Sequence, residues 1–297
     1  MADQHSPTAP DEYPRPDDQR RRAQEHPGTD RAMEPEPDHG EHSYRGSGKL
    51  TGRRAVITGG DSGIGRAVAI AYAREGADVV LSYLEEEQED AELTAEWVRE
   101  AGRRAVLVPG DITGEAHCAD VVRRAVAELG GIDLLVNNAA YQMSQADGLA
   151  GISTAQFDRV LKTNLYAMFW FCKESVPHMP RGAAIVNTAS IQASQPSPNL
   201  LDYATTKGGI VTFTKGLAQD LADRAIRVNA VAPGPVWTPL IPATMPTEEL
   251  DSFGAQTPLG RAAQPAELAP AYVFLASGES SYVSGAVLAV TGGVPMP

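Results

Sequence analysis

The stretch AVITGGDSGIGRAVA, residues Ala55–Ala69, changes character at its centre. An apolar run gives way to an alanine-rich one, and the junction is dense in glycine: Gly59, Gly60, Gly63 and Gly65. Glycine adopts backbone conformations that other residues avoid, and it lets another molecule come close to the main chain. The stretch therefore predicts a strand that passes through a tight turn into a helix. The turn serves either packing alone or a ligand, and the rest of the chain bears on that choice.

The composition limits the class of protein. Of 297 residues, 42% are hydrophobic and 6% aromatic, which suits an α/β domain built on Ala, Val, Leu and Ile. The net charge of −13 argues against nucleic acid or an anionic membrane as partner, since both attract clustered Lys and Arg. No apolar run resembles a membrane span or a signal peptide. Cys118 and Cys172 lie far apart and form neither a disulfide framework nor a zinc pattern. We therefore expect a cytoplasmic protein with no metal site.

Residues 1–47 differ from the rest of the chain. They are rich in Pro, Asp, Glu, Arg and His and contain almost no aliphatic side chains. Such a segment buries too little apolar surface to offset the entropy lost on ordering, so we expect an extended or disordered arm. Two roles stay open for it: a solvated tail, or an arm that lies along a neighbouring subunit and is anchored by Tyr44.

From residue 48 onward, short apolar runs alternate with stretches of helical period. Seven runs are typical of buried strands: Ala55–Thr58, Asp78–Tyr83, Ala105–Pro109, Leu134–Asn137, Ala184–Thr188, Arg227–Val231 and Ala286–Thr291. Six stretches have helical period: Ile64–Glu75, Gln88–Ala101, Glu115–Leu129, Ser153–Val176, Tyr203–Leu221 and Ala266–Leu275. This alternation predicts one α/β domain, residues 48–297, with a doubly wound, seven-stranded parallel sheet flanked by helices.

The glycine turn falls where such a fold binds ligands, outside the carboxyl ends of the strands. The free N–H groups and the dipole at the start of the following helix suit a pyrophosphate. The spacing Thr58-Gly59-x-x-x-Gly63-x-Gly65 resembles the T-G-x-x-x-G-x-G pattern of the short-chain dehydrogenase/reductase family. The resemblance covers roughly Leu50–Gly293 and implies a Rossmann fold with a nicotinamide dinucleotide cofactor.

Three further stretches extend the resemblance. GDIT (Gly110–Thr113) follows the third predicted strand, VAPGPVWTPL (Val231–Leu240) follows the sixth, and NNAA (Asn137–Ala140) ends the fourth, with alanine where the family usually has glycine. The cofactor contacts that the resemblance implies are Gly59, Asp61, Ser62, Gly63, Ile64, Gly65, Ser82, Tyr83, Asp111, Ile112, Asn138, Ala139, Ala140, Tyr203, Lys207, Pro233, Gly234, Val236 and Thr238.

The end of the second predicted strand bears on the choice between NADP and NAD. A carboxylate at this point usually binds the ribose hydroxyls of NAD. Here Ser82, Tyr83 and Leu84 occupy the region, and the acidic run Glu85–Glu87 comes slightly later. The missing carboxylate removes repulsion against a 2′-phosphate, but no Arg is present to bind one. We expect NADP, with NAD as the alternative.

Tyr203 and Lys207, in DYATTKGG, stand four residues apart and share one face of a predicted helix. An ammonium near a phenol favours the phenolate and lowers the phenol pKa from about 10, which suits proton exchange at neutral pH. Ser190 follows a strand run, and Asn164 lies in an apolar helical stretch, where its amide needs a partner.

These four residues match the Asn-Ser-Tyr-Lys tetrad of the family. By that resemblance, Tyr203 exchanges a proton with the carbonyl or alcohol oxygen, and Ser190 orients this oxygen. Lys207 binds the nicotinamide ribose and lowers the pKa of Tyr203. Asn164 holds a water that links Lys207 to solvent.

The substrate contacts are predicted to be Ser190, Gln192, Tyr203 and Trp237, with Ile191 and Gln195 beside them. The segment Pro239–Arg261 has little regular pattern and is predicted to form a mobile lid. Ser194 has no nucleophile-elbow pattern around it, so a hydrolase is not expected.

Within the family, GGDSGIG, YLEEEQEDA and SIQASQPSPNLLDYATTKGG resemble the bacterial glucose/ribitol dehydrogenase-like group, which includes general stress proteins and NADP-dependent aldehyde reductases. This likeness implies a homotetramer and a small carbonyl or alcohol substrate: an aldehyde, ketone, sugar or polyol. Two alternatives remain, a cofactor-binding regulator or redox sensor without turnover, and another reaction on the same scaffold such as dehydration or epimerisation.

Overall fold

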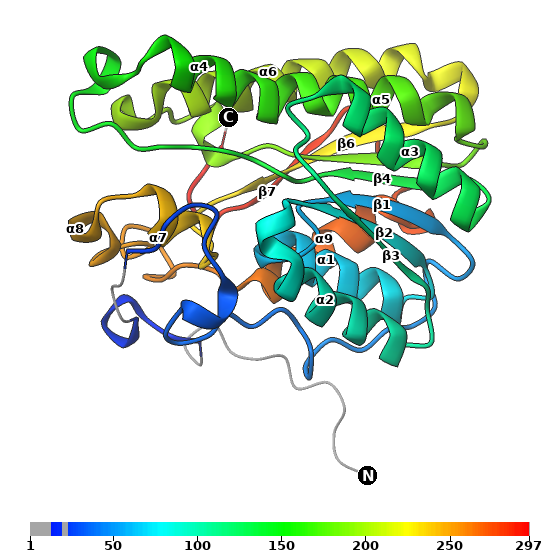
Figure 1. Ribbon diagram of the computed structural model, residues 1–297, viewed down its shortest axis with the longest axis horizontal. Coiled ribbons are helices and arrows are strands. Elements are labelled where there is room, and N and C mark those ends of the chain that lie inside the picture. The colour runs from blue at the N-terminus through cyan, green and yellow to red at the C-terminus, as the bar shows by residue number, and fades with distance from the viewer. Residues whose placement is uncertain (1–12, 20–22, 297) are drawn as a thin grey trace.

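A seven-stranded parallel sheet forms the centre of the protein. The structure is a computed structural model that describes residues 13–19 and 23–296 (Figure 1). The strands lie in the order β3-β2-β1-β4-β5-β6-β7. Their bounds are β1 Arg54–Thr58, β2 Asp78–Tyr83, β3 Ala105–Pro109, β4 Leu134–Asn137, β5 Ala184–Thr188, β6 Arg227–Pro233 and β7 Val287–Val290. The chain reverses its direction of winding between β1 and β4, and the prediction of a doubly wound parallel sheet is confirmed.

Helices cover both faces of the sheet (Figure 1). On one face lie α1 (Gly63–Arg74), α2 (Gln88–Glu100) and α9 (Pro265–Ala276). On the other lie α3 (Glu115–Leu129), α4 (Thr154–Leu161), α5 (Ala167–Ser175) and α6 (Leu201–Asp220). Two short helices, α7 (Leu240–Thr244) and α8 (Thr247–Leu250), fold the segment after β6 that the sequence predicts as a lid. None of the helices within the described residues combines the length and apolarity that crossing a membrane requires.

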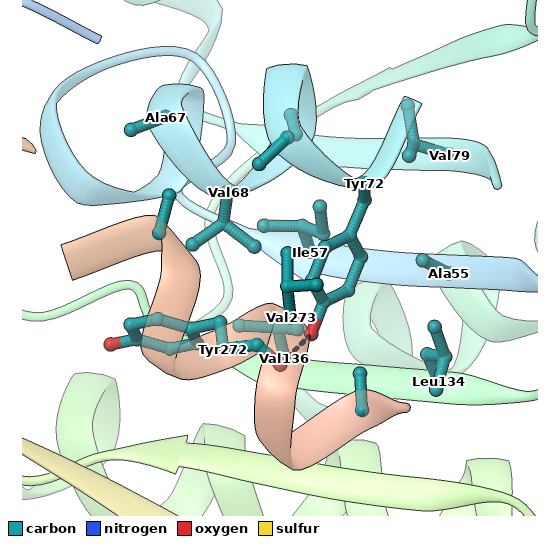
Figure 2. Close-up of a cluster of buried hydrophobic side chains, with 14 of the residues drawn as sticks. Ala55, Ile57, Ala67, Val68, Tyr72, Val79, Leu134, Val136, Tyr272 and Val273 are labelled. Carbon is teal, nitrogen blue, oxygen red and sulfur yellow. Dashed lines mark hydrogen bonds between the residues drawn. The ribbon is translucent and has the colours of Figure 1, made fainter. Parts of the chain in front are cut away.

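The packing of α1 against α9 fixes one half of the core (Figure 2). Val68 and Tyr72 of α1 are fully buried and lie over Ile57 of β1. The hydroxyl of Tyr72 donates to the main-chain carbonyl of Tyr272 on α9 at 3.2 Å. A buried tyrosine that finds this partner keeps its large apolar ring in the core without leaving a polar group unpaired. The two helices are thereby held together over β1.

The arm predicted from composition packs on its own domain. Its described residues, 13–19 and 23–47, have little regular structure, and we call residues 23–47 the N-terminal arm. The indole N–H of Trp237 donates to the carbonyl of Pro35 at 2.9 Å, and Arg74 donates to the carbonyls of Gly40 and Tyr44. The hydroxyl of Tyr44 binds Glu75 of the same chain at 2.7 Å. Tyr44 therefore anchors the arm within its own chain.

A buried group of charges holds the middle of the arm. Asp30 and His39 of the arm are 0% and 1% exposed, and Arg66 of α1 is 3% exposed. One carboxylate oxygen of Asp30 lies 3.1 Å from Nε2 of His39 and 3.2 Å from Nη1 of Arg66. Burial alone would lower the pKa of His39, but the charge of Asp30 and hydrogen bonds to Asp30 and Glu41 outweigh it and raise the pKa to about 9.

This group makes the stability of the fold depend on pH. Protonated His39 contributes in full below its unfolded pKa of about 6.5, and the contribution is lost as the pH rises through about 9. We expect the difference in free energy of unfolding between the wild type and His39→Gln to shrink by about 3 kcal/mol between pH 6 and pH 10. Denaturant titration at both pH values measures it. The same substitution at exposed His178 is the control, and an equal response of both variants would contradict the assignment.

Candidate active site

A cavity of about 360 Å³ runs along the carboxyl edge of the sheet, and we call it the cleft. It begins at the glycine turn and ends between the start of α6 and the segment that follows β6. It brings together most of the residues predicted from the sequence: Gly59, Asp61, Ser62, Gly63, Ile64, Ser82, Tyr83, Asp111, Ile112, Asn138, Ala139, Ala140, Ser190, Gln192, Tyr203, Lys207, Pro233, Gly234, Val236 and Thr238. Residues from all parts of the domain thus meet in one hollow.

The glycines of the turn meet two different requirements, a backbone conformation with positive φ and close packing of α1 on β1. Gly59 and Gly63 have φ of 61° and 49°, a region that favours glycine, and both line the cleft. Gly65 does not line it. A Cβ on Gly65 would stand 1.7 Å from the carbonyl oxygen of Gly59, so this glycine lets α1 pack against the end of β1. The turn therefore serves packing and leaves the main chain open to a ligand.

The end of β4 is fastened to this turn. The amide of Asn138 donates to the carbonyls of Thr58 and Gly59, both at 3.2 Å. In return, the hydroxyl of Thr58 accepts from the main-chain N–H groups of Asn138 and Ala139, both at 3.0 Å. The floor of the cleft is thus rigid where the two halves of the sheet meet.

The polar groups near β2 fit a ligand rich in hydroxyls and phosphates. The hydroxyl of Ser82 is buried, lines the cleft and has no hydrogen-bond partner among the described residues. Such a group normally has a partner. A cradle of glycines at the start of α1 stands next to it. These residues fit the ribose and pyrophosphate of a dinucleotide.

Two carboxyl groups lie in this part of the cleft, and the sequence singled out only Asp61 as a cofactor contact. Asp61 and Glu87 both line the cleft. Burial, with the charge of Asp61 added, raises the pKa of Glu87 to about 9, and burial raises the pKa of Asp61 to about 6. None of the described residues that line the cleft between Ser82 and Asp111 is Lys or Arg. For Glu87, the signal in the sequence was the acidic run Glu85–Glu87. Glu87 lies nearer to the cleft than the place of this run after the second strand suggested.

Three residues of the predicted tetrad share one wall of the cleft. Ser190 follows β5, and its hydroxyl accepts from the N–H of Gln192 at 3.1 Å. Tyr203 and Lys207 lie on α6 and are 9% and 1% exposed. The ammonium nitrogen of Lys207 stands 5.1 Å from the ring centroid of Tyr203 and donates to the carbonyl of Thr188 at 2.7 Å.

Burial is the largest influence on this pair. It raises the pKa of Tyr203 to about 12, although a hydrogen bond to Ser190 acts in the opposite direction. It also lowers the pKa of Lys207 to about 7. The sequence led us to expect a lowered phenol pKa, but the shift is in the opposite direction, because burial disfavours the phenolate of Tyr203 and the charged form of Lys207 alike. Ligand hydroxyls bound to Lys207 would favour its charged form and with it a lower phenol pKa.

Asn164 supports the cleft from behind. It lies in a π-helical turn, Lys162–Tyr166, between α4 and α5, so the predicted helical stretch Ser153–Val176 is continuous but contains a wider turn at this point. Its amide accepts from the N–H of Tyr141 at 2.8 Å and donates to the carbonyl of Tyr141 and the hydroxyl of Thr206, both at 3.0 Å. These bonds hold the loop after β4 against α6. Such wide turns are frequent at functional sites.

Two predicted substrate contacts lie elsewhere. Trp237 is 1% exposed and packs with Met33 and Ala262 under the arm, so it does not reach the cleft. Gln195 is exposed and donates to the carbonyl of Pro295. Lining residues that the sequence did not single out include His26, Pro27, Tyr141, Gln142, Arg159, Asn199, Met245, Glu249 and Phe253. Among these, Arg159 and Glu249 place charges of opposite sign on the lining.

The fold and this site define an α/β protein whose cleft has the form of a dinucleotide-binding site. Comparison with known proteins identifies the family. A family described as Enoyl-(Acyl carrier protein) reductase matches residues 59–295. The glucose and ribitol dehydrogenase of Daucus carota is 45% identical over 90% of this chain and 93% of its own. The NADPH-dependent aldehyde reductase 1 of Arabidopsis thaliana, a chloroplastic protein, is 44% identical over 90% of this chain and 94% of its own.

A solved structure agrees with these sequences. A short-chain dehydrogenase from Burkholderia cenocepacia, crystallised with NADP, superposes with a TM-score of 0.77 at 30% identity, over 82% of this chain and 98% of its own. The chain belongs to the short-chain dehydrogenase/reductase family and is an NAD(P)-dependent oxidoreductase. The family that the glycine spacing predicted is confirmed.

The support from Asn164 can be measured. Asn164→Ala leaves the N–H and C=O of Tyr141 without these partners, and we expect the free energy of unfolding to fall by about 2 kcal/mol. Asn199→Ala, which removes amide contacts of Asn199 to Ser144 and Glu249, is the control and should cost less than about 1 kcal/mol. Denaturant unfolding with an unchanged m-value gives both numbers. Equal costs would show that Asn164 does not hold the loop.

Proposed function

We propose that the protein transfers hydride between NADP and a small carbonyl or alcohol substrate, with Tyr203 as the acid and base. The observation that carries the proposal is the meeting of Ser190, Tyr203 and Lys207 on one wall of a cleft that starts at the glycine turn. A bound nicotinamide supplies or accepts the hydride. The names of the relatives, an aldehyde reductase and a glucose and ribitol dehydrogenase, support aldehydes, sugars and polyols as the substrate class.

Each residue on this wall has a role that follows from its contacts. The hydroxyl of Tyr203 gives its proton to the carbonyl oxygen during reduction and takes one from the alcohol during oxidation. The hydroxyl of Ser190, fixed by the N–H of Gln192, donates to the same oxygen and orients it. Lys207 keeps donor hydrogens beyond its bond to Thr188 for the nicotinamide ribose, and its charge stabilises the phenolate that Tyr203 leaves behind. Asn164 is proposed to hold a water molecule through which Lys207 exchanges protons with solvent.

The choice of NADP rests on a balance of charges. Ser82 and Tyr83 stand where an NAD-binding carboxylate would lie, and two similar proteins are named for NADP or NADPH. Asp61 and Glu87 lie close by. Glu87, with its pKa raised to about 9, stays protonated at neutral pH and can donate a hydrogen bond to phosphate, whereas Asp61, with a pKa of about 6, is largely ionised there.

This balance predicts a pH dependence that only NADPH shows. As the pH rises from 7 to 10, Glu87 ionises and repels the 2′-phosphate, so the ratio of NADPH to NADH affinity should fall by about tenfold. Fluorescence titrations with both cofactors measure the ratio, and NADH controls for groups that affect both. In Glu87→Gln the fall should disappear. A wild-type ratio that does not change would place the 2′-phosphate away from Glu87.

The role of Tyr203 gives a direct test of turnover. Tyr203→Phe should lower kcat about 10²–10⁴-fold for aldehyde reduction with NADPH while the cofactor dissociation constant stays within about twofold. Fully exposed Tyr282→Phe is the control and should keep full activity. A panel of aldehydes, ketones, sugars and polyols is assayed in both directions. NADPH binding without turnover of any of them would favour the alternative, a cofactor-binding regulator.

The proposed assembly is a homotetramer. Phe157 of α4, Tyr166 of the π-helical turn and Phe169 of α5 are 40%, 52% and 46% exposed, which is unusual for aromatic side chains on one stretch of helix. This exposure supports an assembly in which other copies of the chain cover these side chains, and sedimentation equilibrium gives its mass. The proposed localisation of the protein is the cytoplasm.

A further inference from the structure

The N-terminal arm passes over the cleft. His26 and Pro27 line the same cavity as Gly63, Asn138 and Tyr203. The ring of His26 stands edge-on to that of Tyr141, with 4.9 Å between the centroids. Tyr141 follows β4 and belongs to the loop that Asn164 holds. A segment that looked like a solvated tail in the sequence therefore supplies part of the wall of the active site.

The crossing is fixed at one end by the segment after β6. The main-chain N–H of Gln24 donates to the carbonyl of Pro242 at 3.0 Å. A Cβ on Gly28 would stand 2.9 Å from the carbonyl oxygen of Pro239, and Gly28 has φ of 80°. The arm therefore lies directly on this segment, with no room for another side chain between them.

The crossing is fixed at the other end by the glycine turn itself. The carboxylate of Asp30 accepts from the main-chain N–H of Gly63 at 3.2 Å. This carboxylate is the centre of the buried group with His39 and Arg66, and Arg66 also pairs with Asp90 at 3.0 Å. A buried carboxylate with two cationic partners is costly to withdraw, because withdrawal leaves uncompensated charges in the interior. Residues 25–29 thus span the distance between two firm attachments.

We propose that residues 24–30 of the arm form the outer wall of the cofactor site, with His26 in contact with the bound dinucleotide and Asp30 as the residue that positions this wall on the glycine turn. The inference rests on the proposed function, since it takes the ligand of the cleft to be NADP. A dinucleotide between this wall and the sheet leaves only after the crossing opens. The arm therefore controls how long the cofactor stays.

The chemistry of His26 suits such a contact. Burial and the neighbouring charge of Arg159 lower its pKa, while Glu86 acts in the other direction, so the ring is neutral near pH 7. A neutral imidazole offers one donor and one acceptor together with a flat apolar face. It can pack against a sugar or an aromatic ring and bind a hydroxyl without adding charge to the cleft.

The chain offers a matched control for His26. His42 also lies on the arm and also stands edge-on to an aromatic ring, that of Trp97, at 5.3 Å, but it does not line the cleft. We expect His26→Ala to raise the NADPH dissociation rate about tenfold, because the wall loses its contact with the ligand. His42→Ala should stay within about twofold of the wild type. Stopped-flow displacement of NADPH, followed by its fluorescence, measures the rates.

A second pair of variants tests the attachment. Asp30→Asn keeps an oxygen for the N–H of Gly63 but removes the charge that Arg66 and His39 pair with. It should also speed NADPH release, and amide hydrogen exchange of residues 24–30 should rise. Tyr44→Phe loosens the arm at Glu75, away from the cleft, and should change neither. In the wild type, NADPH should slow exchange in residues 24–30 and leave residues 41–47 as they were.

The outcomes separate the two proposals. If the wild type binds neither NADPH nor NADH, the proposed function is wrong and the wall has no dinucleotide to contact. If the wild type binds NADPH but His26→Ala releases it at the wild-type rate and exchange of residues 24–30 ignores the cofactor, the proposed function stands and the role of the arm is overturned. Faster release with His26→Ala and not with His42→Ala supports it.

Discussion

The structure depends on the close approach of α1 to the end of β1, which only glycine at position 65 allows. Any side chain there would overlap the carbonyl of Gly59. Because α1 starts so near the strand, its first N–H groups face the carboxyl edge of the sheet, and the turn that precedes it is short enough for Asn138 to reach two of its carbonyls. The same approach brings Tyr72 over the sheet to α9. Fold and cleft thus share one cause.

Local signals in the sequence were sufficient for most of the fold. β2, β3, β4 and β5 begin and end at the predicted residues, since a strand buried on both faces is a short apolar run bounded by polar or turn residues. The same approach did not predict the wide turn inside the helical stretch Ser153–Val176. Periodicity describes one segment at a time, whereas the wide turn at Asn164 is stabilised by Tyr141, which lies 23 residues away in the sequence. The candidate site was found largely by motif, because its residues follow strand ends that the fold gathers at one edge.

The packing of the arm could not be predicted in this way, for a physical reason. Composition measures how much apolar surface a segment can bury, but the arm is held chiefly by polar contacts with residues far away in the chain. The carboxylate of Asp30 accepts a hydrogen bond from the N–H of Gly63 and pairs with Arg66. The indole N–H of Trp237 donates to the carbonyl of Pro35. The last of these contacts also explains the error over Trp237. Its neighbours in the motif line the cleft, but its own side chain is covered by a segment about 200 residues earlier in the sequence.

The buried ionisable groups of the cleft share one property. Tyr203 and Glu87 have raised pKa values and Lys207 has a lowered one, so burial favours the neutral form of each. A ligand with hydroxyls and phosphates supplies the hydrogen bonds and charge that water no longer provides, and the charged forms needed for proton exchange become accessible when it binds. Electrostatic interactions are stronger where water is excluded. By covering the cleft, His26 and Pro27 would exclude water from the region where Lys207 acts on Tyr203. The segment with the least apolar sequence in the chain would thus help to create the low-dielectric surroundings on which the catalytic pair depends.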